Sequence, residues 1–317
     1  MKEFLKKHAF PVIYGLLLAA FTVYITLDTF VITRVYRTGT AVSETEITED
    51  SDAAAGGVTE EQEEETENET PAEIVCDENS YSDGTVSISI STCREYDTDI
   101  YVADIRISDP SLLKTALAQN AYGKNVTEKT SEMAEENGAI LAINGDYYGA
   151  QEKGYVLRNG VLYRSRAESG QEDLVIWEDG SFEIICEDDV TAEELLEKGA
   201  VQILSFGPGL VEDGSISVSE TEEVGKAKAS NPRTAIAVTE DGHYLFIVSD
   251  GRTSESAGLS LYELASFAES LGAVTCYNLD GGGSSTMYFN GSIVNNPTSS
   301  GNSISERSVS DIVYIGY

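Results

Sequence analysis

Residues 274–289 read VTCYNLDGGGSSTMYF, and this stretch contains the pattern from which the fold can be inferred. The run 274–279 is largely apolar and has the length of a buried strand. It ends in an aspartate, three consecutive glycines and two serines, after which a second apolar run begins. Three glycines in a row cost conformational entropy and are rarely needed for a turn alone. We therefore expect a strand that carries Asp280 into a cleft, followed by a loop whose N–H groups can approach an oxyanion.

Two other apolar runs end in the same way. Residues 139–143 lead into NGDYY, which contains Asp146, and residues 244–248 lead into SDGR, which contains Asp250. Strand ends are rigid supports from which side chains can converge on one cleft. For Asp250 and its following glycine a plain turn is the alternative. The three carboxylates are therefore candidates for a shared site.

Two-residue turns separate several pairs of apolar runs elsewhere in the chain. The turns are Asn159-Gly160, Asp179-Gly180 and Asn290-Gly291. Their residues tolerate the positive φ angles of hairpin turns, so each predicts a β-hairpin. Alternation of apolar and polar residues predicts further strands over residues 86–90 and 101–107.

Helical patterns are fewer. Capping boxes join Thr191 to Glu194 and Ser260 to Glu263, and each precedes a leucine-containing segment that a glycine ends. Short helices are expected from Pro110 and over residues 131–137. Hairpins with scattered helices predict an α+β fold, in which a mixed or antiparallel sheet packs against a few helices.

The first 71 residues divide into segments of different composition. After a short segment, 1–9, residues 10–33 are apolar enough to span a bilayer, with a cleaved signal peptide as the alternative. Residues 34–71 are expected to form an acidic, disordered spacer that separates the domain 72–317 from the membrane. Three lysines before the span favour a cytoplasmic N-terminus and an extracytoplasmic domain in a single-pass cell-membrane protein.

Composition excludes several functions. The chain has 20 Lys and Arg against 55 Asp and Glu, a net charge of -35, which argues against nucleic-acid binding. The two histidines, His8 and His243, are poorly placed for a catalytic triad, and the four cysteines contain no zinc-type pair. Acid–base chemistry therefore falls to carboxylates. Cys76 and Cys93 flank a strand and could form a disulfide in an oxidising compartment.

Positive charge is scarce in the C-terminal region. After Lys228 the only basic residues other than His243 are Arg233, Arg252 and Arg307. Structural salt bridges are one explanation for them. If two of them lie in a cleft, they would form a bidentate site for a phosphate.

Five segments together carry a family resemblance. They are residues 142–148, 231–235, 248–252, 278–287 and 306–311. In this order they resemble the phosphodiester glycosidase domain family, over most of residues 75–317. The resemblance implies hydrolysis of a sugar 1-phosphodiester, of N-acetylglucosamine type or another, in a surface glycan or glycopolymer. The alternative is a non-catalytic protein that binds such a glycopolymer or assists exopolysaccharide assembly.

The resemblance also suggests roles for individual residues. Asp280 or Asp146 would act as base or nucleophile, with Glu306 as a further acid–base candidate. Asp250 would act as a catalytic or positioning carboxylate. The expected substrate-binding residues are Arg233, Arg307, Arg252, Asn144, Asn278, Gly281, Gly282, Ser284 and Ser285. No cofactor is required by the sequence, although the carboxylates could instead hold Ca²⁺ or Mg²⁺.

Overall fold

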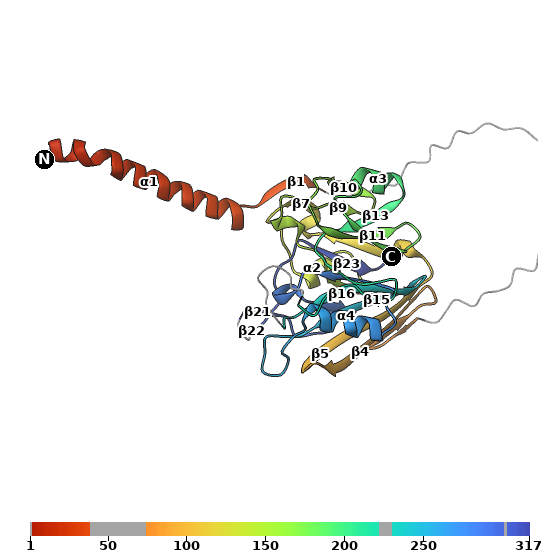
Figure 1. The fold of residues 1–317 in the computed structure, drawn as a ribbon. Coiled ribbons are helices and arrows are strands. Elements are labelled where there is room, and N and C mark those ends of the chain that lie inside the picture. The colour runs from red at the N-terminus through yellow and green to blue at the C-terminus, as the bar shows by residue number, and fades with distance from the viewer. Residues whose placement is uncertain (1, 39–73, 222–229, 301–302) are drawn as a thin grey trace, which may run out of the picture.

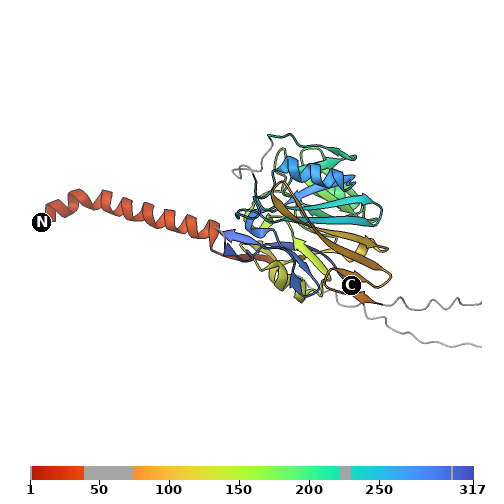
Figure 2. The same ribbon diagram turned by 90° about the horizontal axis from the view of Figure 1, so that it is seen from below.

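The computed structural model describes residues 2–38, 74–221, 230–300 and 303–317. A long N-terminal helix, α1 (Lys2–Phe30), projects from a domain of stacked β-sheets (Figures 1 and 2). The sheets are antiparallel throughout their described pairs, and the described residues of the domain form three α-helices beside them. The α+β fold with an antiparallel sheet is therefore confirmed.

The largest sheet has nine strands in the order β15-β14-β18-β16-β17-β5-β4-β3-β2. Their bounds are β2 Val75–Cys76, β3 Ser80–Ser82, β4 Val86–Glu95, β5 Thr98–Ile107, β14 Gly209–Glu212, β15 Ser215–Ile216, β16 Thr234–Glu240, β17 His243–Ser249 and β18 Thr275–Leu279. Helix α4 (Leu261–Ser270) covers one face of this sheet through Leu264, Phe267 and their neighbours. The other face, with Ile236, Phe246 and Leu279, belongs to the main core.

A five-stranded sheet, in the order β20-β19-β8-β23-β6, contributes to the same core. Its strands are β6 Leu113–Leu117, β8 Leu141–Asn144, β19 Met287–Phe289, β20 Ser292–Ile293 and β23 Asp311–Ile315. Helix α2 (Thr130–Glu136) packs on its outer face, where Met133 contacts a second apolar cluster. The two sheets therefore form a sandwich, each with one helix-covered face.

A third sheet, β10-β9-β13-β11-β12, lies above the sandwich in Figure 1. Its strands are β9 Val156–Arg158, β10 Val161–Arg164, β11 Glu172–Trp177, β12 Phe182–Cys186 and β13 Ala200–Leu204. Helix α3 (Ala192–Glu197) closes its outer side. Leu174, Ile176 and Leu204 extend from this sheet into the main core, so the sheets share one apolar interior.

The local predictions are confirmed at the turns and caps. The three two-residue turns join β9 to β10, β11 to β12 and β19 to β20. Both capping boxes are formed, at the starts of α3 and α4. The helix expected at Pro110 is a single 3-10 turn, Pro110–Leu112, and the one expected over 131–137 is α2.

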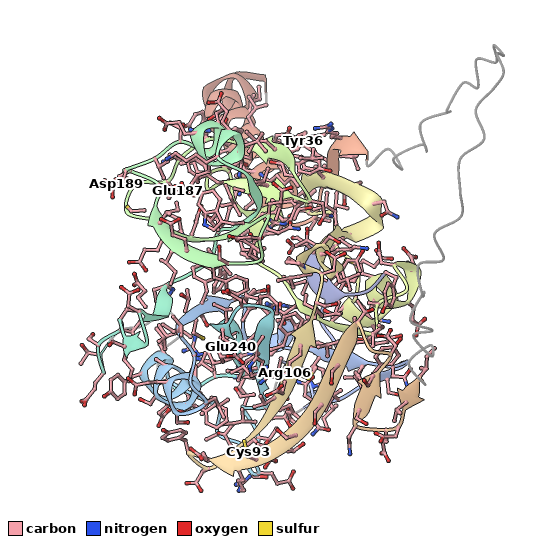
Figure 3. The ribbon with its side chains drawn as sticks, turned by 90° about the vertical axis from the view of Figure 1, so that its right-hand side faces the viewer. Tyr36, Cys93, Arg106, Glu187, Asp189 and Glu240 are labelled. Carbon is pink, nitrogen blue, oxygen red and sulfur yellow. The ribbon has the colours of Figure 1, made fainter. Side chains whose placement is uncertain are left out.

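The proposed disulfide is not formed, since all four cysteines are free in the described chain. Cys76 pairs with Tyr81, and Tyr81 pairs with Ile88, so the register places Cys76 five residues from the position of Cys93 along β4. At 3.2–3.4 Å per residue this offset is too long for a bridge. Figure 3 shows Cys93 at the end of the β4–β5 pair, far from Tyr36.

The N-terminal segment differs from the expected arrangement. Residues Ile13–Phe30 of α1 are apolar enough to cross a membrane. Directly after the helix, β1 (Arg34–Thr38) pairs with β7 (Ala121–Lys124) of the domain. Residues 34–38 are therefore part of the domain, and the remainder of the expected spacer lies outside the described residues.

We predict that β1 is held by its pairing with β7. Replacing Gly123 by alanine would place a Cβ inside the contact distance of the Arg34 carbonyl oxygen, which the pairing does not allow. In the full chain, hydrogen exchange of the bonded β1 amides should therefore be slow, and at least about tenfold faster in Gly123→Ala. The amides of β4 and β5 provide the internal control. Exchange of wild-type β1 at the rate of an unstructured peptide would contradict this placement.

Candidate active site

The glycine loop after β18 lies at the junction of the two main sheets. Asp280 follows β18 of the nine-stranded sheet, and after the 3-10 turn Gly282–Ser284 the chain enters β19 of the five-stranded sheet. The Asp280 N–H donates to the Gly145 carbonyl at 3.3 Å, and Asn144 Nδ2 donates to the Asp280 carbonyl at 2.6 Å. The ends of β8 and β18 therefore meet, as expected from the sequence.

The Asp280 carboxylate has two charged or polar partners. Its Oδ2 accepts hydrogen bonds from Ser284 Oγ at 2.5 Å and from Arg307 Nη2 at 3.0 Å. Arg307 Nε also donates to Ser284 Oγ at 3.0 Å, which closes a three-residue network. Burial raises the pKa of Asp280, whereas Arg307 and Ser284 oppose that rise, and the net shift is upward.

All three C-terminal arginines surround the glycine loop. A Cβ on Gly282, whose φ is 66°, would lie 2.7 Å from the Arg252 guanidinium, and one on Gly281 would lie 3.9 Å from Arg233 Cδ. Arg252 donates to Asn231 Oδ1 through Nε at 3.2 Å and Nη2 at 3.1 Å. Arg233 is buried and donates through Nε to the Leu259 carbonyl. Glycines are needed here because any side chain would collide with the neighbouring arginine or backbone.

Asn144 and Asn278 hold the strands that carry the site. Asn144 Oδ1 accepts from Thr234 Oγ1 at 2.9 Å and from the Thr286 N–H at 3.2 Å, so it joins three strand ends. Asn278 Nδ2 donates to the Gly207 carbonyl at 2.7 Å. Both side chains are fully buried. Asn144 therefore supports the Asp280 backbone, while the Asn278 side-chain oxygen has no hydrogen-bond partner among the described residues.

Three other predicted site residues are also engaged in the fold. Asp250 accepts from the Asn296 N–H at 2.8 Å and from the Tyr101 hydroxyl at 3.1 Å. Glu306 accepts from the N–H and hydroxyl of Ser131 in the first turn of α2. Ser285 is completely buried. Asp250 and Glu306 surround the candidate site, but their polar atoms stabilise the loops that form it, whereas the Ser285 hydroxyl has no hydrogen-bond partner among the described residues.

The backbone next to Asp146 contacts that of Asp280, through the bond from the Asp280 N–H to the Gly145 carbonyl. The Asp146 carboxylate, however, belongs to a buried ion pair. Arg158 Nη2 binds Asp146 Oδ2 at 2.7 Å, and Arg158 Nε binds Asp311 Oδ2 at 2.8 Å. Asp146 also accepts from the Tyr148 and Ser205 N–H groups, both at 2.9 Å. Asp146 is 1% exposed, so it differs from the expected free base or nucleophile.

Sequence reasoning missed Arg158 and Asp311, which form this ion-pair network. Burial, followed by the charge of Asp146, raises the pKa of Asp311, and Arg158 opposes that rise. The sequence feature that could have indicated a buried ion pair was Arg158 itself, because it ends the apolar strand β9 just before a turn. A fully buried arginine needs a carboxylate partner, but the sequence does not show which one.

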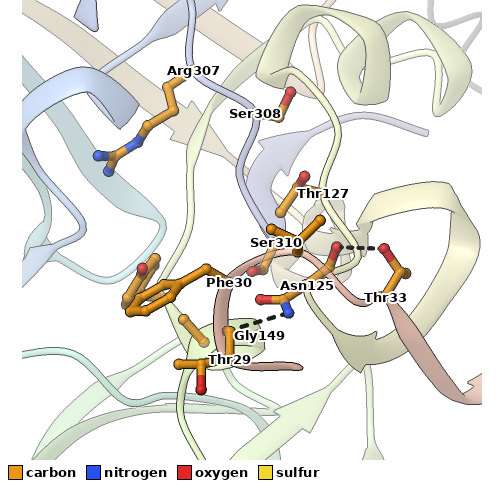
Figure 4. A pocket seen from close by; sticks show the side chains of 12 residues that line it. Thr29, Phe30, Thr33, Asn125, Thr127, Gly149, Arg307, Ser308 and Ser310 are labelled. Atoms are coloured by element: carbon orange, nitrogen blue, oxygen red, sulfur yellow. Dashed lines mark hydrogen bonds between the residues drawn. The ribbon is translucent and has the colours of Figure 1, made fainter. Parts of the chain in front are cut away.

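A pocket of about 670 Å³ opens beside Arg307 (Figure 4). Arg307 lines it and, through its bond to Asp280, connects the pocket to the buried carboxylate. Tyr147, which is 46% exposed, provides an aromatic surface in the same wall. The lining comprises Thr29, Phe30, Val31, Thr33, Asn125, Thr127, Tyr147, Gly149, Ala150, Arg307, Ser308 and Ser310.

The residues of the site do not fit a Ca²⁺ or Mg²⁺ ion. Such ions require several free oxygen ligands. Asp280, Asp146 and Asp250 already accept hydrogen bonds from arginine, amide or hydroxyl donors. Across the described ranges, no group of three or more His, Cys, Asp or Glu side chains could hold a metal.

Comparison with known proteins identifies a family for this chain. The family model of phosphodiester glycosidases matches residues 137–316, so the chain belongs to that family. A SPbeta prophage-derived protein of Bacillus subtilis, YomE, is 31% identical over 201 residues, covering 62% of this chain and 31% of YomE. Mouse N-acetylglucosamine-1-phosphodiester alpha-N-acetylglucosaminidase is 28% identical over 213 residues, covering 61% of this chain and 40% of the enzyme. The chain thus spans less than half the length of these relatives.

Solved structures share the fold. The catalytic domain of the zebrafish N-acetylglucosamine-1-phosphodiester alpha-N-acetylglucosaminidase, auto-inhibited by its pro-peptide, superposes with a TM-score of 0.58 at 22% identity. The match covers 73% of this chain and 83% of that one. A hypothetical protein from Synechocystis gives a TM-score of 0.51 at 16% identity. At these identities the likeness concerns the fold alone.

We predict that Ser284 sets the protonation of Asp280. In Ser284→Ala the carboxylate loses a hydrogen bond that favours its charged form, so the pKa of Asp280 rises further. If Asp280 acts in its ionised form, the acid limb of the pH profile of kcat/KM moves to higher pH. The kcat/KM for hydrolysis of a sugar phosphodiester at pH 5 then falls by about tenfold. Ser215→Ala, on an exposed edge strand, is the matched control. An unchanged acid limb would contradict the assignment.

Proposed function

We propose that this protein is a membrane-anchored hydrolase that cleaves the bond between a sugar C1 and a phosphodiester. The N-terminal helix would anchor it, with the domain outside the cytoplasm, and the substrate would be a surface glycan or glycopolymer. Family membership supports the reaction class, and the named activity of the mouse relative suggests an N-acetylglucosamine 1-phosphodiester. The observation that carries the proposal is Asp280, held by Arg307 and Ser284 beside the pocket.

In this proposal Asp280 supplies the carboxylate that acts at C1, either on a water molecule or directly on carbon. The C1–O bond breaks and its electron pair leaves with the phosphate monoester, while water supplies the new hydroxyl at C1. A phosphate is a good leaving group when its charge is stabilised, so a strong general acid is less necessary than in ordinary glycoside hydrolysis. This matches a site whose described carboxylates other than Asp280 are mostly committed to structural bonds.

Arg307 is proposed to receive the phosphate. It lines the pocket and its side chain is 44% exposed, so its guanidinium can reach a ligand while it remains bonded to Asp280. A guanidinium presents five N–H donors in a planar fork, which suits two phosphate oxygens. The Arg307 N–H donates to the Gly283 carbonyl at 3.3 Å, which places the glycine loop beside it, and Ser308 and Ser310 add hydroxyls to the pocket. Arg233 and Arg252 contribute positive charge behind the loop.

The central test is Asp280→Asn in the full chain. Removing the carboxylate that acts at C1 should reduce the release of N-acetylglucosamine from its methyl 1-phosphodiester by at least about 100-fold. Asp213→Asn, in the exposed β14–β15 turn, should retain wild-type turnover. Near-normal turnover by Asp280→Asn would remove Asp280 from the chemistry. Binding of the ester by the wild-type chain without any turnover would instead favour a glycopolymer-binding protein.

A further inference from the structure

The pocket beside Arg307 is built from two distant parts of the chain. One wall comes from the domain and includes Tyr147, Arg307 and Ser310. The other wall comes from the end of α1 and the residues after it, namely Thr29, Phe30, Val31 and Thr33. Figure 4 shows Phe30 and Arg307 in the wall of the same pocket. The end of the apolar helix therefore helps to form the candidate substrate site.

Specific bonds fix this helix end to the domain. Asn125 Nδ2 donates to the Ile32 carbonyl at 3.0 Å and to the Thr29 carbonyl at 3.3 Å. Thr33 Oγ1 donates in return to the Asn125 carbonyl at 3.3 Å. The pairing of β1 with β7 begins one residue later. The distance between the helix end and the pocket is thus set by structure and not by a flexible tether.

The length of the helix then places the pocket relative to a bilayer. The apolar segment Ile13–Phe30 has 18 residues, which at 1.5 Å per residue span about 27 Å, close to the ~30 Å hydrocarbon core. Phe30 would therefore lie at the hydrocarbon boundary. Thr29, Phe30 and Val31, which line the pocket, are then at this boundary. The headgroup layer beyond it is roughly 5–8 Å thick, so the pocket meets the membrane where the hydrocarbon core joins the headgroups.

We propose that the substrate is a lipid-linked glycosyl phosphodiester that enters the pocket from the membrane. This inference rests on the proposed function and on α1 as a membrane span. The sugar lies toward Asp280, the phosphate binds Arg307, and the lipid chain leaves past Phe30 and Val31. These two apolar side chains are 75% and 63% exposed beside the pocket, which is where a lipid chain needs an apolar surface.

The charge of the domain favours the same route. Residues 71–317 contain fifteen Lys and Arg against forty-one Asp and Glu, so the domain repels dissolved anions at long range. A phosphodiester carried by a lipid reaches the pocket by lateral diffusion, at a high local concentration set by the membrane. Arg307 then acts only at short range.

The test compares two esters of N-acetylglucosamine 1-phosphate that differ only in the alcohol, methyl and hexadecyl. The full chain is reconstituted in phosphatidylcholine vesicles, and sugar release is measured for each. We expect kcat/KM to be at least about tenfold higher for the hexadecyl ester. Adding inert phosphatidylcholine at constant ester should slow hydrolysis of the hexadecyl ester by surface dilution and leave the methyl ester unaffected.

Variants connect this preference to the helix end. Phe30→Ser should reduce the ratio of hexadecyl to methyl turnover severalfold, because the lipid chain loses its apolar contact. Ile74→Ser replaces an apolar residue of similar exposure, 67%, that does not line the pocket, and should keep the wild-type ratio.

Three outcomes would overturn the proposal. Equal turnover of both esters by the wild-type chain would refute the lipid-linked substrate and leave the glycosidase activity intact. No cleavage of either ester would refute both. Faster cleavage of both esters by Phe30→Ser would show that the helix end blocks the pocket.

Discussion

The buried ion pairs of Arg158 with Asp146 and Asp311 are the interaction on which the candidate site depends. Arg158 comes from the third sheet, and its two partners lie at the ends of neighbouring strands, β8 and β23, in the five-stranded sheet. Removing one member of a buried ion pair costs roughly 3–5 kcal/mol, since a charge is left without a partner. Asp146 follows Asn144, which holds the Asp280 carbonyl, and Asp311 follows the segment that carries Arg307. The ion pairs thus fix both sides of the site.

The carboxylates of the site differ in their surroundings because of this arrangement. Asp146 and Asp311 are buried against one arginine, whereas Asp280 contacts a half-exposed Arg307 beside a pocket. A carboxylate in a fully paired interior has little freedom to act on a ligand. Asp280 is also buried, but the network that it shares with Ser284 reaches solvent through Arg307. The proposed mechanism therefore relies on one carboxylate, Asp280, and one cation, Arg307, among many acidic residues.

Local sequence signals predicted the hairpins, the capping boxes, the α+β fold and the meeting of the ends of β8 and β18, because each depends on residues close in sequence or on strand ends. The network of Arg158 was not predictable, since its partners are 12 and 153 residues away. The docking of β1 was missed for a similar reason. The five residues Arg34–Thr38, in which Val35 and Tyr36 are exposed, have no sequence pattern that predicts a strand. They form one because they pair with β7, which is distant in sequence.

The central claim is that the sugar–oxygen bond breaks while the phosphorus–oxygen bonds survive. Turnover of a glycosyl phosphodiester in ¹⁸O-labelled water, followed by ³¹P NMR of the released phosphate monoester, tests it directly. The account predicts that the phosphate contains no ¹⁸O, because water attacks C1 and the phosphate leaves with its original oxygens. An ¹⁸O isotope shift in the phosphate signal would mean attack at phosphorus and would contradict the account.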